Sequence, residues 1–289
     1  MGSASDDGFA GSKVPLNDII RSMNRVYGLD ISGYEPSFLI RTIERRLQAT
    51  GCDSAASYLA ERLLVDPSEA EVFSRSLRVG YSEFFREPLT FALLERRVLP
   101  DLMERGRMTG RTGLRVWSAG CAAGQEVWSV AILLDELLAS ADRLRAWRVF
   151  ATDISESDLS LACAGVYPAA ALGNVRLRHV DACFTRQGDC HTVAMRIREH
   201  VEFAVYDLLD TATACPPMCI FGDFDLVLCC NVLIYYRPDQ RRRIIAKLLG
   251  CLAPGGYLVT GEAERRLMAQ AGGVLEVAPP APVFQATRR

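Results

Sequence analysis

The segment FDLVLCCNVLIYY, residues 224–236, decides how this chain is interpreted. Its mostly apolar first half is typical of a buried strand. The strand runs into Cys229, Cys230 and Asn231, and three apolar residues and two adjacent tyrosines follow. Ligands of a parallel α/β sheet bind outside the carboxyl ends of its strands, so this strand end marks a candidate site if the sheet is parallel.

Strand and helix patterns alternate around this segment from about residue 113 onward. Strands are predicted at residues 114–120, 147–153, 201–207, 224–230 and 257–262. Helices are predicted at residues 126–139, 155–165 and 239–256, the second with a serine cap and the third ending at Pro-Gly-Gly. Two short strands near residues 274–277 and 283–286 are expected to form a hairpin. This order predicts an α/β fold with a doubly wound sheet.

Two parts of the chain depart from the alternation. Residues 15 to about 100 show helix patterns without a strand candidate, and residues 15–80 are predicted to form a separate helical domain. The stretch at residues 166–200 is too long for an ordinary connection, and its CHTVAMRIR alternates polar and apolar residues as a half-exposed strand does. We expect a small β insertion there, within a second domain at residues 81–289. Residues 1–14 are predicted to be disordered.

The net charge, the length of the apolar runs and the cysteines of the chain bear on its class of function. The 289 residues carry a formal net charge of −2 with a pI near 6.0, which does not favour a general nucleic-acid binder. No apolar run is long enough to span a membrane, and the start lacks a signal-peptide pattern. The ten cysteines contain no C-x-x-C pair and lie in apolar segments. They favour free thiols in a cytoplasmic protein.

A zinc site is the alternative reading of the cysteines. A loose cluster of potential ligands comprises Cys183, Cys190, His191, Cys215 and Cys219. Its spacing matches no standard structural zinc pattern. We therefore predict no metal.

Residues that suit a nucleoside follow the predicted strands. Gly120 and Gly124 bracket a tight turn between the first strand and its helix. Asp153 ends the second strand, where a carboxylate can accept hydrogen bonds from ribose hydroxyls, although a helix cap is the alternative role. Asp207 and Asn231 end the third and fourth strands. The turn lacks G-x-G-x-x-G spacing and a P-loop lysine, so S-adenosylmethionine fits better than NAD or ATP.

The chain resembles the CheR-type chemotaxis receptor methyltransferases over residues 15–265. Two of the shared motifs, FFRE and N-V-x-I-Y, are not general features of Rossmann-like folds. The motifs that carry the resemblance occur in family order: FFREP (84–88), RVWSAGCAAGQEVWS (115–129), FATDIS (150–155), VEFAVYDLL (201–209), FDLVLCCNVLIYY (224–236) and LAPGGYLVTGEAE (252–264).

The resemblance implies a Rossmann-like class I methyltransferase sheet, an N-terminal all-helical domain and a β insertion. It also implies transfer of a methyl group from S-adenosylmethionine to glutamate side chains of chemoreceptor helices, with S-adenosylhomocysteine as the product. We expect a monomer. Catalytic roles are implied for Arg86 and Tyr235. The implied cofactor-binding residues are Ser82, Arg86, Gly120, Gly124, Gln125, Glu126, Asp153, Asp207, Leu208, Cys230 and Asn231. Arg41, Arg45 and Arg46 are the implied contacts to the receptor bundle.

Several positions depart from the family pattern, including the run at residues 261–264, which reads GEAE in place of GHSE. Cys230 replaces an arginine, Gly80 replaces an asparagine, and Gln125 replaces a glutamate. A thiol cannot make the charge-assisted contacts of a guanidinium. The departures leave two alternatives open: a methyltransferase for another carboxylate or a small molecule, and a weakly catalytic module that binds S-adenosylhomocysteine or the receptor.

Overall fold

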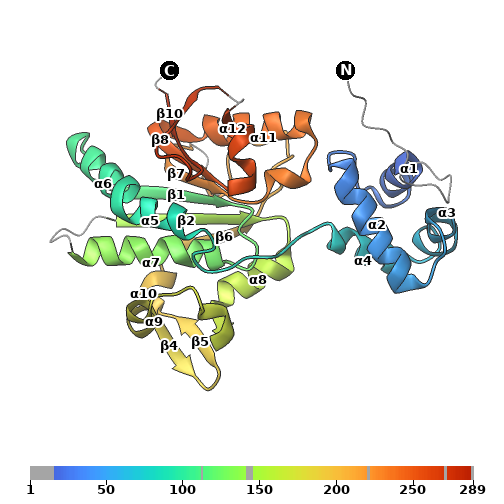
Figure 1. Ribbon diagram of the computed structural model, residues 1–289, viewed down its shortest axis with the longest axis horizontal. Coiled ribbons are helices and arrows are strands. Elements are labelled where there is room, and N and C mark those ends of the chain that lie inside the picture. The colour runs from blue at the N-terminus through green and yellow to red at the C-terminus, as the bar shows by residue number, and fades with distance from the viewer. Residues whose placement is uncertain (1–15, 112, 141–145, 220–221, 270–271, 288–289) are drawn as a thin grey trace. The chain divides into compact units, whose positions relative to one another are not determined.

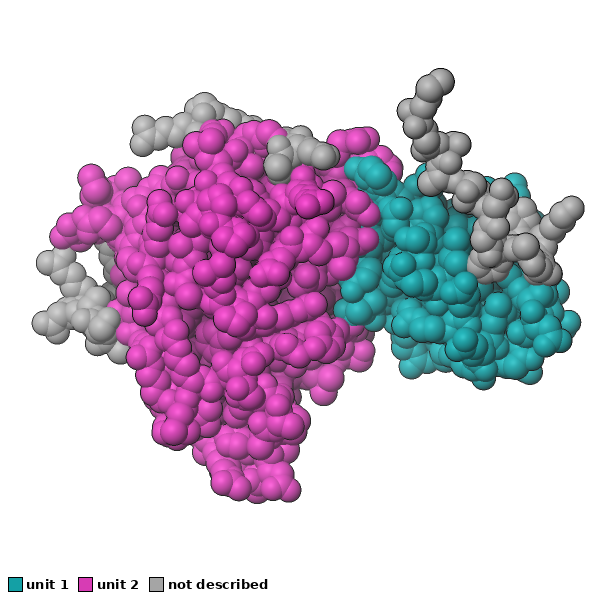
Figure 2. Space-filling model, viewed as in Figure 1, with its two compact units in different colours: residues 1–79, 235–238 teal, residues 80–234, 239–289 magenta. Residues whose placement is uncertain are grey.

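The computed structural model describes residues 16–111, 113–140, 146–219, 222–269 and 272–287. The prediction of disorder at residues 1–14 lies outside the described residues. The chain divides into two compact units, which Figure 2 shows in different colours. Unit 1 comprises Met1–Val79 and Tyr235–Pro238, and unit 2 comprises Gly80–Ile234 and Asp239–Arg289.

Unit 1 is helical, as its apolar periodicity predicts. Its helices are α1 (Leu16–Tyr27), α2 (Pro36–Thr50), α3 (Ala55–Tyr58), which continues into a π-helical turn (Leu59–Leu63), and α4 (Pro67–Ser76). Helix α2 begins with a proline in its first turn and ends at Gly51, whose φ of 69° lies in the left-handed region. The core of this unit includes Met23, Leu39 and Phe73, all at most 1% exposed.

The last two residues of the segment at residues 224–236 belong to unit 1. The Tyr235 carbonyl accepts a hydrogen bond of 2.8 Å from the Glu35 amide, and its ring lies 4.8 Å from the ring of Phe38. Tyr236 stacks on Tyr34 at 5.3 Å. The segment therefore leaves the sheet and continues as part of the helical unit.

Unit 2 is built on a seven-stranded sheet in the order β6-β2-β1-β7-β8-β10-β9 (Figure 1). The first five strands in this order are parallel, and β10 and β9 are antiparallel additions. The predicted alternation and hairpin are confirmed. The strands are β1 (Gly113–Ala119), β2 (Ala146–Asp153), β6 (Val201–Val205), β7 (Phe224–Cys229), β8 (Leu252–Thr260), β9 (Val274–Glu276) and β10 (Val283–Ala286).

Helices cover both faces of this sheet, which gives the three layers of a doubly wound fold. Figure 1 shows α7 and α8 on one side and α11 on the other. The helices of unit 2 outside the insertion are α5 (Pro88–Leu93), α6 (Leu99–Met108), α7 (Gln125–Ser140), α8 (Glu156–Ala164), α11 (Pro238–Gly250) and α12 (Arg265–Ala269). Among the described residues, no helix has both the length and the apolar character that crossing a bilayer requires.

Several predicted boundaries in unit 2 differ from the structure by two or more residues. The helix predicted at residues 239–256 ends at Gly250, and β8 already begins at Leu252 instead of Tyr257. Pairing of β8 with β7 shifts register between Phe224 and Leu226, and this irregularity accommodates the Pro-Gly-Gly sequence inside the strand. The third parallel strand ends at Val205, so Asp207 lies in the loop beyond it.

The insertion forms its own three-stranded antiparallel sheet in the order β3-β5-β4. Its elements are β3 (Val166–Pro168), α9 (Leu177–Cys183), β4 (Phe184–Gln187), β5 (Cys190–Val193) and α10 (Met195–Arg198). CHTVAMRIR was expected to be one strand, but only its first four residues are. Val193 and Ile197 are both buried, and their spacing of four suits a helical turn as well as an alternating strand.

Candidate active site

The candidate site lies where the strand order of the main sheet reverses. Strand β1 has β2 on one side and β7 on the other, so the carboxyl ends of these three strands adjoin. The Gly120 amide donates to the Thr152 carbonyl at 2.8 Å. A Cβ at Gly120 would lie only 2.6 Å from a methyl carbon of Val232. The structure thus brings the predicted glycine turn, Asp153 and the Asn231 segment together.

Asp153 is fixed by backbone amides on both of its oxygens. Oδ2 accepts from the Ala122 amide at 2.8 Å, and Oδ1 accepts from the Ser155 amide at 2.9 Å. The cap of α8 is Ser155, whose Oγ accepts from the Asp158 amide, so Asp153 is not the capping residue. Burial raises the pKa of Asp153. Each carboxylate oxygen retains a lone pair, so the side chain suits a vicinal diol.

The start of α7 carries the second group of polar side chains. Gly124, with φ of 90°, leaves no room for a Cβ, which would lie 2.7 Å from the Ala162 Cβ. The buried Gln125 Oε1 has no hydrogen-bond donor among the described residues. An unpaired buried acceptor is costly, and an ammonium or amide donor on a ligand would satisfy it. This orphaned oxygen beside the glycine turn fits the amino-acid end of S-adenosylmethionine.

Glu126 lies next to Gln125 and is enclosed. Ser118 Oγ donates to Glu126 Oε1 at 2.7 Å, and the Cys230 thiol is a second hydrogen-bond partner. Burial raises the pKa of Glu126. Burial, followed by the neighbouring Glu126 carboxylate, raises the pKa of Cys230 as well. Cys230 is therefore a protonated thiol at neutral pH, where the family has a cation.

The FFRE segment approaches these residues with charges of both signs. Arg86 is exposed, with its guanidinium carbon 5.0 Å from the centre of the Tyr81 ring, and its charge favours ionisation of Glu126. Glu87 accepts from the Glu262 amide at 2.9 Å, and burial raises its pKa. Phe84 is fully buried and belongs to the hydrophobic core. Within this segment, the exposed guanidinium of Arg86 is therefore the group that can contact a ligand.

The remaining predicted cofactor residues line neighbouring loops. Asp207 Oδ1 accepts from the Leu209 amide at 2.8 Å, and the Tyr206 amide donates to the Asp153 carbonyl at 3.0 Å, which places this loop beside β2. Leu208 is buried and Ser82 is half-buried. A Cβ at Gly80 would lie 2.8 Å from a carboxylate oxygen of Asp158. A side chain at position 80 would therefore collide with the Asp158 carboxylate.

Sequence reasoning missed Glu264, which organises the strand end. Its buried carboxylate accepts from the amides of Gly261, Asn231, Leu233 and Ile234 at 2.8, 2.9, 2.6 and 3.3 Å. Asn231 has φ of 61°, a left-handed conformation that this hydrogen bond helps to hold. Burial raises the pKa of Glu264 to about 7. The only sequence signal was its place at the end of the GEAE motif.

The predicted receptor contacts on α2 differ from one another. Arg46 Nε and Nη2 donate to the two oxygens of Glu69 at 2.8 and 2.7 Å, so its guanidinium is used inside unit 1. Burial disfavours the charged form of Glu69, but hydrogen bonds from Arg46 and Tyr58 outweigh it and lower the Glu69 pKa. Arg41 and Arg45 are exposed and four residues apart on one face. The predicted receptor contact of Arg41 and Arg45 stays a prediction, whereas the guanidinium of Arg46 is engaged with Glu69.

The loose cysteine cluster is divided between two places. Cys183, Cys190 and His191 lie in the insertion, whereas Cys215 and Cys219 lie in the loop between β6 and β7. Within the described ranges, no three His, Cys, Asp or Glu side chains are grouped as metal ligands.

Fold and site together define an α/β protein of the S-adenosylmethionine-binding class. Two family models match the chain: "CheR methyltransferase, SAM binding domain" over residues 81–276, and "CheR methyltransferase, all-alpha domain" over residues 16–77. The chain belongs to the CheR methyltransferase family.

Three relatives illustrate the similarity. An uncharacterised 104.1 kDa protein of Rhodobacter capsulatus is 33% identical over 255 residues, which are 88% of this chain and 26% of that protein. Chemotaxis protein methyltransferase 1 of Pseudomonas aeruginosa is 37% identical over 185 residues, 63% of this chain and 64% of that one. The chemotaxis protein methyltransferase of Salmonella typhimurium is 31% identical over 244 residues, 82% of this chain and 78% of that one. The chain thus spans less than two thirds of the first two relatives.

Proposed function

We propose that this protein is an S-adenosylmethionine-dependent O-methyltransferase that forms methyl esters on glutamate side chains of chemoreceptor cytoplasmic helices. Two features at the switch point of the sheet support the proposal that the cofactor binds there. Backbone amides hold the Asp153 carboxylate, and the Gln125 Oε1 atom has no hydrogen-bond partner among the described residues. The family models and the printed names of two relatives support the reaction class.

Each group in the site has a proposed task. Asp153 accepts from the ribose hydroxyls, Gln125 and Glu126 receive the ammonium, and Asp207 with Leu208 borders the base. Ser82, Gly120, Gly124, Cys230 and Asn231 complete the walls around the cofactor. The bound cofactor supplies an electrophilic methyl group on a sulfonium sulfur.

The protein needs no general base for the transfer, because a glutamate side chain is already ionised at neutral pH. Its contribution is positioning and exclusion of water. Arg86 is proposed to orient the attacking carboxylate through charge-assisted hydrogen bonds. Tyr235 is proposed as the second catalytic residue, on the resemblance alone.

The proposed partner is the helical bundle of a chemoreceptor cytoplasmic domain. We propose that the protein binds this bundle as a monomer. Arg41 and Arg45 suit acidic side chains on such helices. All ten cysteines are free thiols, which supports a reducing compartment, and we propose the cytoplasm.

The test is methyl transfer from methyl-labelled S-adenosylmethionine to a purified chemoreceptor cytoplasmic fragment. We expect label that is released as methanol by mild base, because carboxyl methyl esters hydrolyse readily. A fragment with its methyl-accepting glutamates changed to alanine and the Arg86→Ala enzyme are the matched controls, and both should lose the label. Base-stable label would instead indicate another acceptor group, and tight S-adenosylhomocysteine binding without any label would indicate a binding module.

A further inference from the structure

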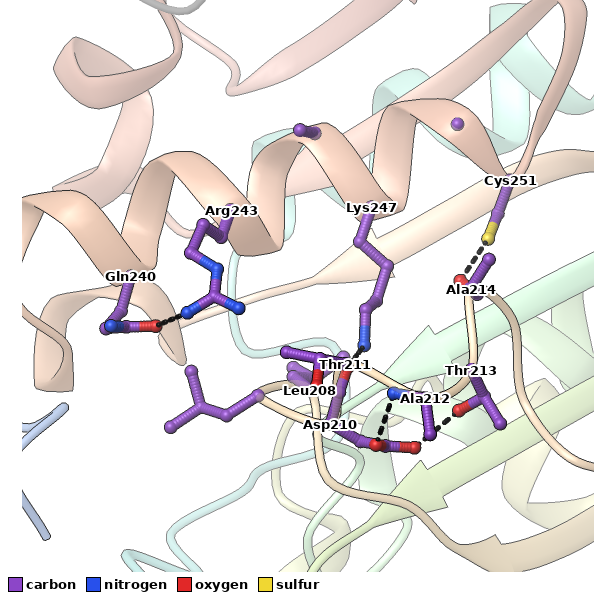
Figure 3. Close-up of a pocket in the computed structure, with 13 residues that line it drawn as sticks. Leu208, Asp210, Thr211, Ala212, Thr213, Ala214, Gln240, Arg243, Lys247 and Cys251 are labelled. Atoms are coloured by element: carbon purple, nitrogen blue, oxygen red, sulfur yellow. Dashed lines mark hydrogen bonds between the residues drawn. The ribbon is translucent and has the colours of Figure 1, made fainter. Parts of the chain in front are cut away.

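Two thiols outside the proposed active site lie against each other. Cys215 lies in the β6–β7 loop and Cys251 lies directly after α11, 36 residues apart in sequence. Their sulfur atoms are 2.9 Å apart. Cys251 Sγ also donates to the Ala214 carbonyl at 3.1 Å, which holds it toward the loop (Figure 3).

The backbone around the pair is closely packed. Gly222, with φ of 62°, has no side chain, and a Cβ there would lie 3.2 Å from Cys215 Sγ and 3.3 Å from the Cys251 Cα. The two chain segments can therefore approach each other closely. A disulfide has a sulfur–sulfur distance of about 2.0 Å, so bond formation requires an approach of about 0.9 Å.

Cys251 is one of the residues that line a pocket of about 500 Å³ between the loop and α11. Figure 3 shows the loop residues on one wall and Gln240, Arg243 and Lys247 on the other. Lys247 Nζ donates to the Asp210 carbonyl at 2.5 Å and to the Tyr206 hydroxyl at 3.0 Å. Noncovalent contacts thus already join the helix to the start of the loop, and a bond at Cys215 would add a covalent attachment near the middle of the loop.

We propose that Cys215 and Cys251 form a reversible disulfide when the protein meets a peroxide, and that this bond fixes the β6–β7 loop against the end of α11. The proposal does not depend on the methyl acceptor or on the proposed function.

Exposure sets the order of the chemical steps. Cys215 is half-buried, whereas Cys251 is buried and its burial raises its pKa. The Cys215 thiolate attacks the peroxide oxygen, which breaks the O–O bond and leaves a sulfenic acid and, after protonation, one water from hydrogen peroxide. The Cys251 sulfur then attacks the sulfenic sulfur, the S–O bond breaks, and the departing hydroxide takes the Cys251 proton as a second water. Two thiols are oxidised by two electrons while the peroxide is reduced.

The experiment is peptide mapping of the full chain after treatment with hydrogen peroxide, with and without later dithiothreitol. Trypsin places Cys215 and Cys251 in different peptides, because it cuts after Arg198, Arg241, Lys247 and Arg265 and does not cut the Arg237–Pro238 bond. We expect a linked peptide pair that dithiothreitol separates. Cys215→Ser and Cys251→Ala should each abolish the pair. Cys219→Ala should retain it, which excludes the other thiol of that loop, and Cys163→Ser should retain it as an exposed control.

Hydrogen exchange tests the effect on the loop. We expect slower amide exchange at residues 207–214 in the oxidised protein than in the reduced one, with no change in Cys215→Ser. Oxidation confined to Cys163 or Cys219, or a linked pair that survives Cys215→Ser, would overturn the assignment. A correct cross-link with unchanged exchange would overturn the claim that the bond fixes the loop.

Discussion

Two carboxylates, the buried Glu264 and the half-buried Glu126, flank the end of β7, and their surroundings differ. Glu264 accepts hydrogen bonds from four backbone amides of the turns that follow β7 and β8. Glu126 has one hydroxyl donor, Ser118, and the weakly donating thiol of Cys230. The first carboxylate is saturated by the fold, whereas the second has acceptor capacity left.

The difference indicates that Glu264 stabilises the structure of the site, whereas Glu126 is available to bind a ligand. Glu264 holds Asn231 in its left-handed conformation and so fixes the strand end. Glu126 lies beside the unpartnered Gln125 oxygen at the start of α7, where a donor is missing. Removing the first should therefore damage the fold, and removing the second should damage binding.

Glu264→Ala should have the largest effect. Four amides lose their acceptor at a buried position, and we expect the free energy of unfolding to fall by about 3–5 kcal/mol. Denaturant unfolding followed by circular dichroism measures it. Glu262→Ala changes an exposed carboxylate in the same 3-10 helix (Glu262–Glu264) and is the matched control, with a change within about 0.5 kcal/mol. Equal unfolding midpoints for Glu264→Ala and Glu262→Ala would contradict the structural role given to Glu264.

The pH dependence of stability should identify Glu264 independently. Its pKa is raised from 4.5 to about 7 in the folded protein, so the folded state binds the proton more tightly than the unfolded chain. Its contribution is complete below about pH 4.5 and is lost as pH rises through about 7, by at most roughly 3 kcal/mol. Unfolding experiments between those pH values should show this loss in the wild type and a smaller one in Glu264→Gln. Asp153 and Glu126 also have raised pKa values, so the difference between the two proteins is the informative quantity.

Arg46→Ala extends the comparison to unit 1. Glu69 would keep the Tyr58 hydroxyl but lose both guanidinium bonds, and we expect unit 1 to lose about 2–3 kcal/mol. Arg41→Ala should leave the free energy of unfolding within about 0.5 kcal/mol of the wild type, because its head group is exposed. Thermal unfolding of both variants measures this. If Arg46→Ala left the free energy of unfolding unchanged, Arg46 would not be needed for the stability of unit 1, and the predicted role in receptor docking would again apply to it.

Glu126→Gln should have a smaller effect that falls on binding. The amide keeps the shape and one acceptor but loses the charge, so we expect S-adenosylhomocysteine to bind about tenfold more weakly, or about 1.4 kcal/mol. The unfolding free energy should change by less than about 1 kcal/mol. Fluorescence or calorimetric titration alongside denaturant unfolding separates the two. A variant that unfolds easily and binds normally would reverse the roles given to the two carboxylates.

Much of unit 2 could be predicted because its signals are local. The alternation of strands and helices, Ser155 as a cap and the glycine turn follow from periodicity and from backbone requirements of neighbouring residues. The position of Asp153 at a strand end also follows, because parallel strands share one carboxyl edge.

The failures have tertiary causes. Nothing in GEAE shows that four amides from two loops converge on Glu264. The pairing of Arg46 with Glu69 joins two helices, whereas periodicity assigns only a helix face. The last residues of CHTVAMRIR fit two periodicities, and the structure takes the helical one. Sequence reasoning groups Tyr235 with the residues of the strand ends, but its contacts with Glu35 and Phe38 make it part of unit 1.

The most direct test of the cofactor site is calorimetric titration of wild type and Asp153→Ala with S-adenosylmethionine and S-adenosylhomocysteine. Asp181→Ala, an exposed aspartate in the insertion, is the control. We predict saturable binding of both nucleosides to the wild type, the same affinity in the control, and binding about 10- to 100-fold weaker in Asp153→Ala. Absence of binding to the wild type, or equal affinity in Asp153→Ala, would contradict the assignment of this strand edge as the cofactor site.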